Sequence, residues 1–162
     1  MLKSQERRQL LKIVGAFFMG AALDARIVGA AISPTDLERK TFASFLNVLL
    51  PRDEYSGSAS DLKVDEKLWA FSENDANYRK LIEVGCQWLN MTGGPPFAEL
   101  ESGQQIVLVE WMSTSDWNQV PRRFYTLVRQ TAIELYYSNP ASWVGTAIDR
   151  PPQPIGYPPP WK

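Results

Sequence analysis

The C-terminal stretch from Arg122 to Lys162 constrains this chain most, because it changes character halfway. Its first part, residues 122–140, is spaced like an amphipathic helix, whereas residues 149–162 form a proline ribbon that cannot build a core of its own. The ribbon still carries Ile155, Tyr157 and Trp161, which gain little by remaining in water. We therefore expect this segment to lie against something, either the chain's own helices or another protein.

The overall composition indicates one globular domain. The chain has 162 residues, of which 44% are hydrophobic and 22% charged, which is ordinary for a soluble protein with a real core. The formal net charge of -1 provides no general attraction for nucleic acid. Six tryptophans indicate either a dense core or an adhesive surface.

The absence of histidine excludes several classes of chemistry. It removes the usual general base near neutral pH, the commonest metal ligand, and the Ser-His and Cys-His nucleophile pairs. The single cysteine, Cys86, cannot form an internal disulfide or hold an iron–sulfur cluster, and we expect it to be a small buried side chain. Carboxylate, lysine or tyrosine catalysis stays open, but the composition disfavours an enzyme. We expect no catalytic, cofactor-binding or metal-binding residues in this chain.

Residues 1–31 have the layout of an export signal. A basic region with Arg7 and Arg8 precedes a mild apolar run, Ile13 to Leu23, and then small residues. The run is too short and too rich in Gly and Ala for a confident membrane span. The Arg7-Arg8 pair resembles a twin-arginine signal, which exports folded proteins, although Glu6 and Leu10 depart from the usual pattern. The alternative is an ordinary amphipathic first helix.

The rest of the chain reads as about five helices with short loops. Pro34 predicts a helix start and Pro51 its end, and Asn74 or Asp75 can cap a later helix. Ser102 and Gln105 predict a capping box before Ile106 to Val109, a run that we assign to a helix rather than a strand. Residues 52–60 are predicted to be a solvated loop, because they lack the regular oxygen ligands of a calcium site.

The helix that begins at Pro121 is predicted to bury one apolar stripe. The stripe consists of Phe124, Leu127, Val128, Thr131 and Leu135, with Tyr125, Ala132 and Tyr136 beside it. Residues 113–120 before it are predicted to be a polar linker. Together the elements predict an all-α fold, a small orthogonal bundle over residues 32–140 with an extended proline-rich tail over residues 141–162.

The C-terminal half resembles the gluconate 2-dehydrogenase subunit 3 family, and shorter matches extend over most of the chain. The matching segments are Phe124-Tyr125-x-Leu127-Val128-Arg129, Thr131-x-x-Glu134-x-Tyr136-Tyr137, Asn139-Pro140-x-x-Trp143 and Pro152-Gln153-Pro154-Ile155-Gly156-Tyr157. Leu50-Pro51-x-Asp53, Gly57-x-Ala59 and Val64-Asp65 are similar to the family's first helix and loop.

The resemblance implies a small subunit of a bacterial dehydrogenase complex. The large subunit would be an FAD-containing oxidoreductase of the glucose-methanol-choline class, which oxidises an alcohol or sugar. The small subunit would stabilise it and supply the twin-arginine signal that takes the pair to the periplasm. Electrons would leave through other proteins, such as a cytochrome c subunit or a quinone.

The residues expected to contact that partner lie in the last helix and the tail. They are Arg129, Glu134, Tyr136, Tyr137, Trp143, Ile155, Tyr157 and Trp161. The alternative is that the aromatics pack on this chain's own helices and that Arg129 and Glu134 form an internal pair. At the level of function, the alternative is a membrane-tethered helical scaffold for a periplasmic redox complex, with residues 1–31 as its anchor. Recognition of the proline ribbon by an aromatic-lined groove is a further option.

Overall fold

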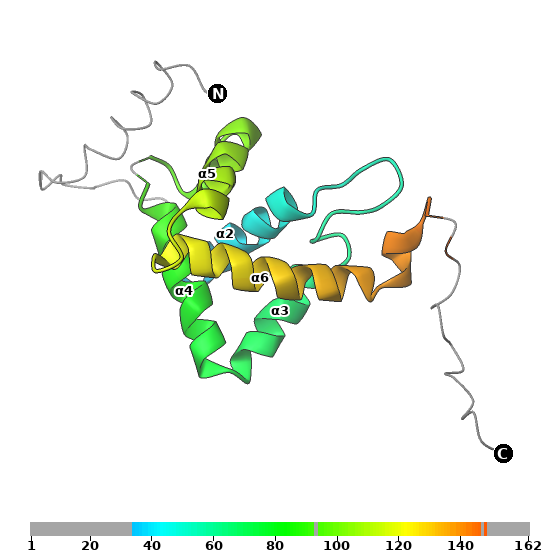
Figure 1. Cartoon of the computed structure of the whole chain (residues 1–162), viewed down its shortest axis with the longest axis horizontal. Helices are drawn as coiled ribbons and strands as arrows, with labels where there is room; N and C mark the ends of the chain where they lie inside the picture. Colours follow the sequence, from blue (N-terminus) through cyan, green and yellow to red (C-terminus); the bar gives the residue numbers. More distant parts are fainter. Residues whose placement is uncertain (1–33, 93, 147, 149–162) are drawn as a thin grey trace, which may run out of the picture.

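A computed structural model describes residues 34–92, 94–146 and 148, and every regular element in these ranges is helical (Figure 1). The five α-helices are α2 (Pro34–Leu49), α3 (Val64–Glu73), α4 (Ala76–Asn90), α5 (Ser102–Thr114) and α6 (Val120–Tyr137). Two short 3-10 helices follow α4 and α6, namely η2 (Phe97–Glu99) and η3 (Pro140–Trp143). The predicted all-α fold of about five helices is confirmed.

Helix boundaries follow local capping chemistry. Asp75 caps α4, since its carboxylate accepts the backbone N–H groups of Asn77 at 2.9 Å and Tyr78 at 3.0 Å. The capping box of α5 lies one residue earlier than predicted, between Glu101 and Gln104. The reason is that Glu101 is the last residue with extended backbone, so the helix has already begun at Ser102.

The ambiguous apolar run belongs to a helix, as predicted, because Ile106 to Val109 lie within α5. The predicted linker 113–120 is shorter than expected. Residues 113 and 114 complete α5 and Val120 begins α6, so the described connection covers residues 115–119.

Helix α6 lies at the centre of the bundle and contacts α2, α3, α4 and α5. In Figure 1 it crosses the middle of the molecule, between α5 and α3. It packs closely against α4 at Gly85, where a Cβ atom would lie only 2.3 Å from the Phe124 ring. A glycine is needed there because any side chain would push the two helices apart.

The buried stripe of α6 differs from the predicted one. Its buried members recur every four residues and are Phe124, Val128, Ala132 and Tyr136. Leu127 is exposed, and Thr131 and Leu135 are only partly buried. The predicted stripe lies too far to one side, because the face of α6 that packs on the other helices runs through Ala132 and Tyr136, which were placed beside the stripe.

Candidate interaction surfaces

The loop after α2 is closed by its own carboxylates. Asp53 accepts the backbone N–H groups of Tyr55 at 2.8 Å and Ser56 at 2.6 Å, and the Ser56 hydroxyl lies 3.1 Å away. These backbone hydrogen bonds, that of Ser56 foremost, lower the pKa of Asp53 below its ordinary 3.8. These hydrogen bonds therefore hold the polar loop in a defined turn conformation.

Asp61 closes the other side of the same loop. It accepts the Ser58 hydroxyl at 2.8 Å and the Ser58 N–H at 2.7 Å, and pairs with Arg52 at 2.7 Å. The hydrogen bond from the Ser58 side chain, followed by that from its backbone, lowers the pKa of Asp61 to about 2. In the described part of the chain, no group of three or more His, Cys, Asp or Glu residues is placed to hold a metal ion.

Tyr136 fastens this loop to the end of α6. Its hydroxyl donates to the Gly57 carbonyl at 2.6 Å and lies 2.9 Å from the Ser56 hydroxyl. The ring is only 4% exposed. Of the two predicted roles for Tyr136, the structure shows packing in the chain's own core, and contact with a partner stays a prediction.

The segment after α6 folds back toward the same loop. Asn139 caps η3 by accepting the Ala141 N–H at 3.1 Å, and the Trp143 indole donates to the Tyr137 carbonyl at 2.8 Å. Trp143 is half-buried by this contact. Residues 140–143 thus form a helical turn, so the predicted extended tail cannot begin at residue 141.

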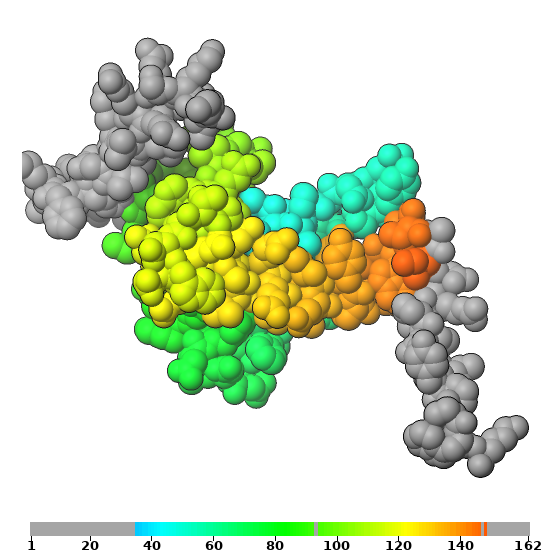
Figure 2. All heavy atoms as spheres, in the orientation of Figure 1, coloured from blue at the N-terminus to red at the C-terminus, as the bar shows by residue number. Residues whose placement is uncertain are grey.

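Gly145 completes the contact between the two segments. Its φ is +86°, a left-handed conformation that suits glycine, and a Cβ there would lie 2.7 Å from the Tyr55 ring. We call this assembly of loop 51–61, the end of α6 and residues 140–146 the junction. Figure 2 shows the loop and the end of the described chain lying side by side.

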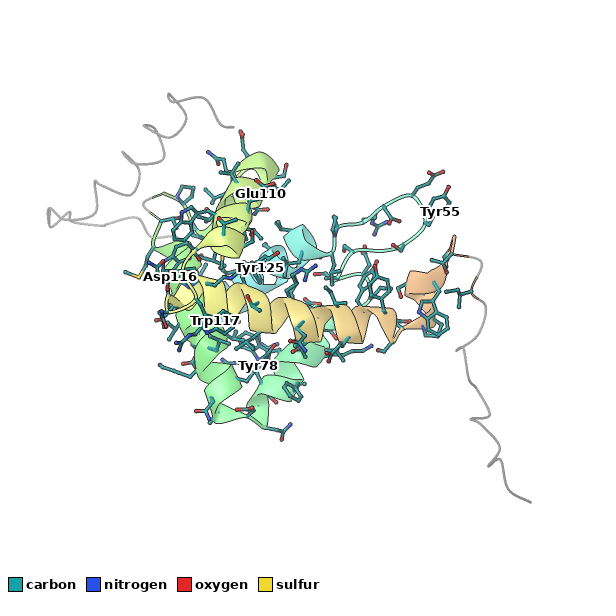
Figure 3. All side chains as sticks on the ribbon, in the orientation of Figure 1. Tyr55, Tyr78, Glu110, Asp116, Trp117 and Tyr125 are labelled. Atoms are coloured by element: carbon teal, nitrogen blue, oxygen red, sulfur yellow. The ribbon has the colours of Figure 1, made fainter. Side chains whose placement is uncertain are left out.

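The junction exposes large apolar side chains. Tyr55, Tyr137 and Val144 are each more than half exposed, and Ile148, just beyond the junction, is 50% exposed. Tyr55 projects from the tip of its loop (Figure 3), and the Tyr137 ring packs edge-on against Tyr136 at 5.2 Å. Tyr137 was predicted as an interface residue. Tyr55, Val144 and Ile148 were missed, although a large tyrosine within a polar loop was a signal for the first of them.

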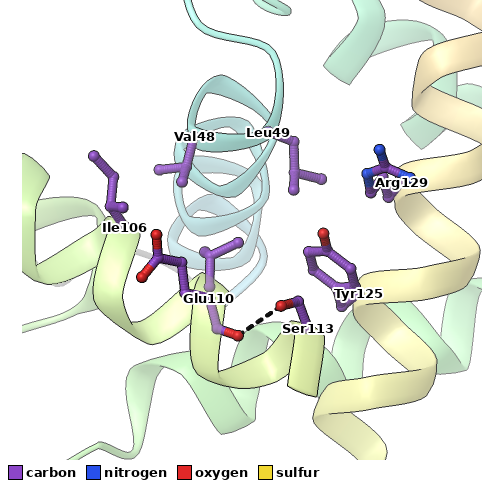
Figure 4. A pocket seen from close by; sticks show the side chains of 8 residues that line it. Val48, Leu49, Ile106, Glu110, Ser113, Tyr125 and Arg129 are labelled. Carbon is purple, nitrogen blue, oxygen red and sulfur yellow. Dashed lines mark hydrogen bonds between the residues drawn. The ribbon is translucent and has the colours of Figure 1, made fainter. Parts of the chain in front are cut away.

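Arg129 and Glu134 do not form an internal pair. Within the described ranges no ion pair joins them, and Glu134 instead accepts a hydrogen bond from Gln130 at 3.4 Å. Five helical positions turn their side chains about 140° apart. Arg129 lies at the edge of an open hollow of about 330 Å³ between α2, α5 and α6, opposite Leu49 and beside Tyr125 (Figure 4).

Cys86 is fully buried and unpaired, as a small hydrophobic side chain would be. Burial raises the pKa of its thiol well above the ordinary value, because the thiolate would lose its hydration. The folded chain therefore presents no reactive thiol at this position.

The remaining predicted site residues lie outside the described residues. They are Arg7, Arg8, Ile155, Tyr157 and Trp161, so the export signal and the tail contacts stay predictions. Among the described helices, none is long and apolar enough to cross a lipid bilayer.

Comparison with known families gives one match. The family model described as gluconate 2-dehydrogenase subunit 3 matches residues 36–157, which is 122 of the 162 residues. The match begins in the first turn of α2 and includes every helix described above. No curated protein and no solved structure matches the chain.

Proposed function

Because the chain belongs to the gluconate 2-dehydrogenase subunit 3 family, we propose that it is a non-catalytic small subunit of an FAD-dependent dehydrogenase complex that acts on CH–OH donors. The family match over residues 36–157 is the observation that carries this proposal. The sequence supports a non-catalytic role, since it has no histidine and its single thiol is buried. The flavin and the substrate pocket then belong to the large subunit.

The junction is the surface best suited to hold that partner. Its hydrogen bonds hold the backbone that carries the exposed Tyr55 and Tyr137, so less backbone freedom is lost on binding. The proline-rich residues 149–162 continue from the same end of the chain, and proline reduces the entropy lost when an extended segment binds. Ile155, Tyr157 and Trp161 would supply the anchoring side chains of that segment.

Export is the second half of the proposal. The Arg7-Arg8 pair would take the assembled complex to the periplasm, where a cytochrome c subunit or a quinone could accept the electrons. A signal on one subunit can serve both because the twin-arginine pathway moves folded cargo. Replacing both arginines by lysine should leave the small and large subunits together in the cytoplasm. Export of the large subunit with an unchanged yield would contradict this part.

Co-purification with the large flavoprotein tests the assembly. Deleting residues 149–162 should release the flavoprotein from the tagged small subunit, and Tyr137→Ser should weaken the complex. Phe71→Ser is a matched control, since Phe71 on α3 is also half exposed and packs edge-on against a tyrosine at 5.5 Å. Equal retention of flavoprotein by all three variants and the unaltered chain would refute the proposed interface.

A further inference from the structure

The middle of helix α5, residues 106–112, is apolar except for Glu110, but the bundle covers only part of it. Val109 and Met112 are buried against the bundle, whereas Ile106, Val107 and Trp111 are 41–48% exposed. We call these three exposed residues the α5 face. A helix that is hydrophobic all round is normally buried all round, so the α5 face is expected to have a cover that the described residues do not supply.

The stretch of chain that includes the α5 face is acidic in sequence, and Arg129 of α6 lines the same hollow as Ile106 and Glu110. Residues 81–121 contain five acidic residues and no lysine or arginine. Glu99 ends η2, Glu101 directly precedes α5, and Glu110 lies in α5 one helical turn from Ile106 (Figure 4). The nearest basic residues in sequence are Arg122 and Arg123, and Arg123 is engaged with the Trp117 carbonyl at 3.1 Å. A cover for this face should therefore be apolar with a basic end.

A segment with that composition precedes the described domain in the same chain. Lys3, Arg7, Arg8 and Lys12 are followed directly by the uncharged run Ile13 to Leu23. In this segment, basic residues come first and apolar residues follow. This arrangement complements the α5 face, where carboxylates adjoin exposed apolar side chains.

The middle of α2 lies beside the segment that leads into α5. The Thr41 hydroxyl in α2 donates to the Asn90 side chain at 2.9 Å, and the same Asn90 oxygen accepts the Phe97 N–H in η2 at 3.0 Å. The ten residues between Leu23 and Pro34 can span about 35 Å when extended. This length exceeds the expected radius of gyration of such a domain, about 13 Å, so the apolar run can reach the α5 face.

We propose that the apolar run Ile13 to Leu23 docks on the α5 face, with the basic residues before it beside Glu101 and Glu110. The docking covers Val107 and Trp111 in the free subunit. It also places Arg7 and Arg8 against the domain, which, if the proposed export function holds, keeps the signal from being read until the run is released.

A disulfide test in the full chain measures this docking directly. Cys86 is buried, so the pair Ala16→Cys and Val107→Cys supplies the only reactive thiols. In dilute protein the intramolecular disulfide should form about tenfold more than with the control pair Ala16→Cys and Lys67→Cys, because docking raises the local thiol concentration. Lys67 is exposed on α3, which Figure 1 shows on the other side of α6 from α5.

Reversing the basic charges of the N-terminal segment is a second test of the docking. Arg7→Glu, Arg8→Glu and Lys12→Glu together should reduce the disulfide yield to that of the control pair. In the chain without added cysteines, the same reversal should shift tryptophan emission to longer wavelength as Trp111 becomes hydrated. Circular dichroism checks that each variant keeps its helices.

Several results would overturn the proposal. Equal yields for the two cysteine pairs would show that the run does not prefer the α5 face. A disulfide that forms only between chains would show that a second copy covers the face instead. Neither test requires the flavoprotein, so failure here is distinguishable from failure of the proposed subunit function.

Discussion

The junction and the α5 face are the two surfaces attached to opposite ends of α6, and they are built in different ways. The junction is held by directional hydrogen bonds, above all from Tyr136 to Gly57 and from the Asp53 and Asp61 carboxylates to their loop. The α5 face has three exposed apolar side chains, with the carboxylates of Glu110 one helical turn away and of Glu101 at the start of the helix.

This difference indicates two kinds of binding. Hydrogen bonds fix a loop in one geometry, so the junction can position exposed rings before a partner arrives. Apolar packing has no preferred direction, so the α5 face can accept an apolar segment with little shape of its own. The junction therefore suits a lasting subunit contact, and the α5 face suits a reversible cover.

Truncating Tyr136 in the junction should have the largest effect on stability. Tyr136→Ala should lower the free energy of unfolding by about 3–5 kcal/mol, because it removes a buried ring. It also leaves the Gly57 carbonyl without its donor. Urea denaturation followed by circular dichroism measures the change. A loss below about 1 kcal/mol would mean that Tyr136 does not hold the junction together.

The role of Tyr136 shows where reading the sequence stops being sufficient. The helix boundaries at Pro34 and Asp75 follow from local capping chemistry and were predicted. The hydroxyl of Tyr136, in contrast, bonds with a loop 79 residues away in the chain, and no local pattern encodes that partner. Its four-residue spacing from Phe124 through Val128 and Ala132 was visible, but a tyrosine at the end of a stripe suits a core and an interface equally well.

The α5 face illustrates the opposite limit. The sequence predicted that residues 106–109 are helical and apolar. It could not predict which side remains exposed, because that depends on how α2 and α6 pack against the helix. The stacking of Trp111 on Trp88, at 5.4 Å and an interplanar angle of 7°, likewise required the arrangement of α4 and α5.

A glycine in each region gives the next comparison. Gly145→Ala should destabilise the junction by about 1–3 kcal/mol, because its φ is +86° and the new Cβ would meet the Tyr55 ring. Gly103→Ala in α5 should instead be neutral or stabilise by up to about 1 kcal/mol, since no atom lies within 4 Å of the new Cβ. Thermal unfolding of both variants checks the opposite signs, and the same sign for both would contradict the comparison.

Trp111→Ala should have a smaller effect on folding. The ring is partly exposed and loses mainly its stacking on Trp88, which is worth about 1 kcal/mol. If the N-terminal run covers this ring, the same substitution should also lower the disulfide yield of the variant with Ala16→Cys and Val107→Cys. A loss of stability as large as that of Tyr136→Ala would show that α5 is held by this pair rather than by Val109 and Met112.

Acid should loosen the junction locally and leave the helices in place. The pKa of Asp61 is about 2 in the folded chain and ordinarily 3.8, chiefly because of the hydrogen bond from the Ser58 hydroxyl. A lowered pKa contributes stability that is complete above pH 3.8 and is lost as the pH falls toward 2. The protection of the Ser58 amide against hydrogen exchange, relative to its intrinsic rate at each pH, should therefore fall across this range. The buried backbone of α6 should stay protected.

Asp61→Asn is the control for this acid response. The amide side chain does not titrate, so the loss of protection that comes from Asp61 should disappear. The remaining change would report Asp53, whose pKa is also lowered by backbone hydrogen bonds from Ser56 and Tyr55. If α6 lost its protection at the same pH as Ser58, the junction would not be a separately held unit.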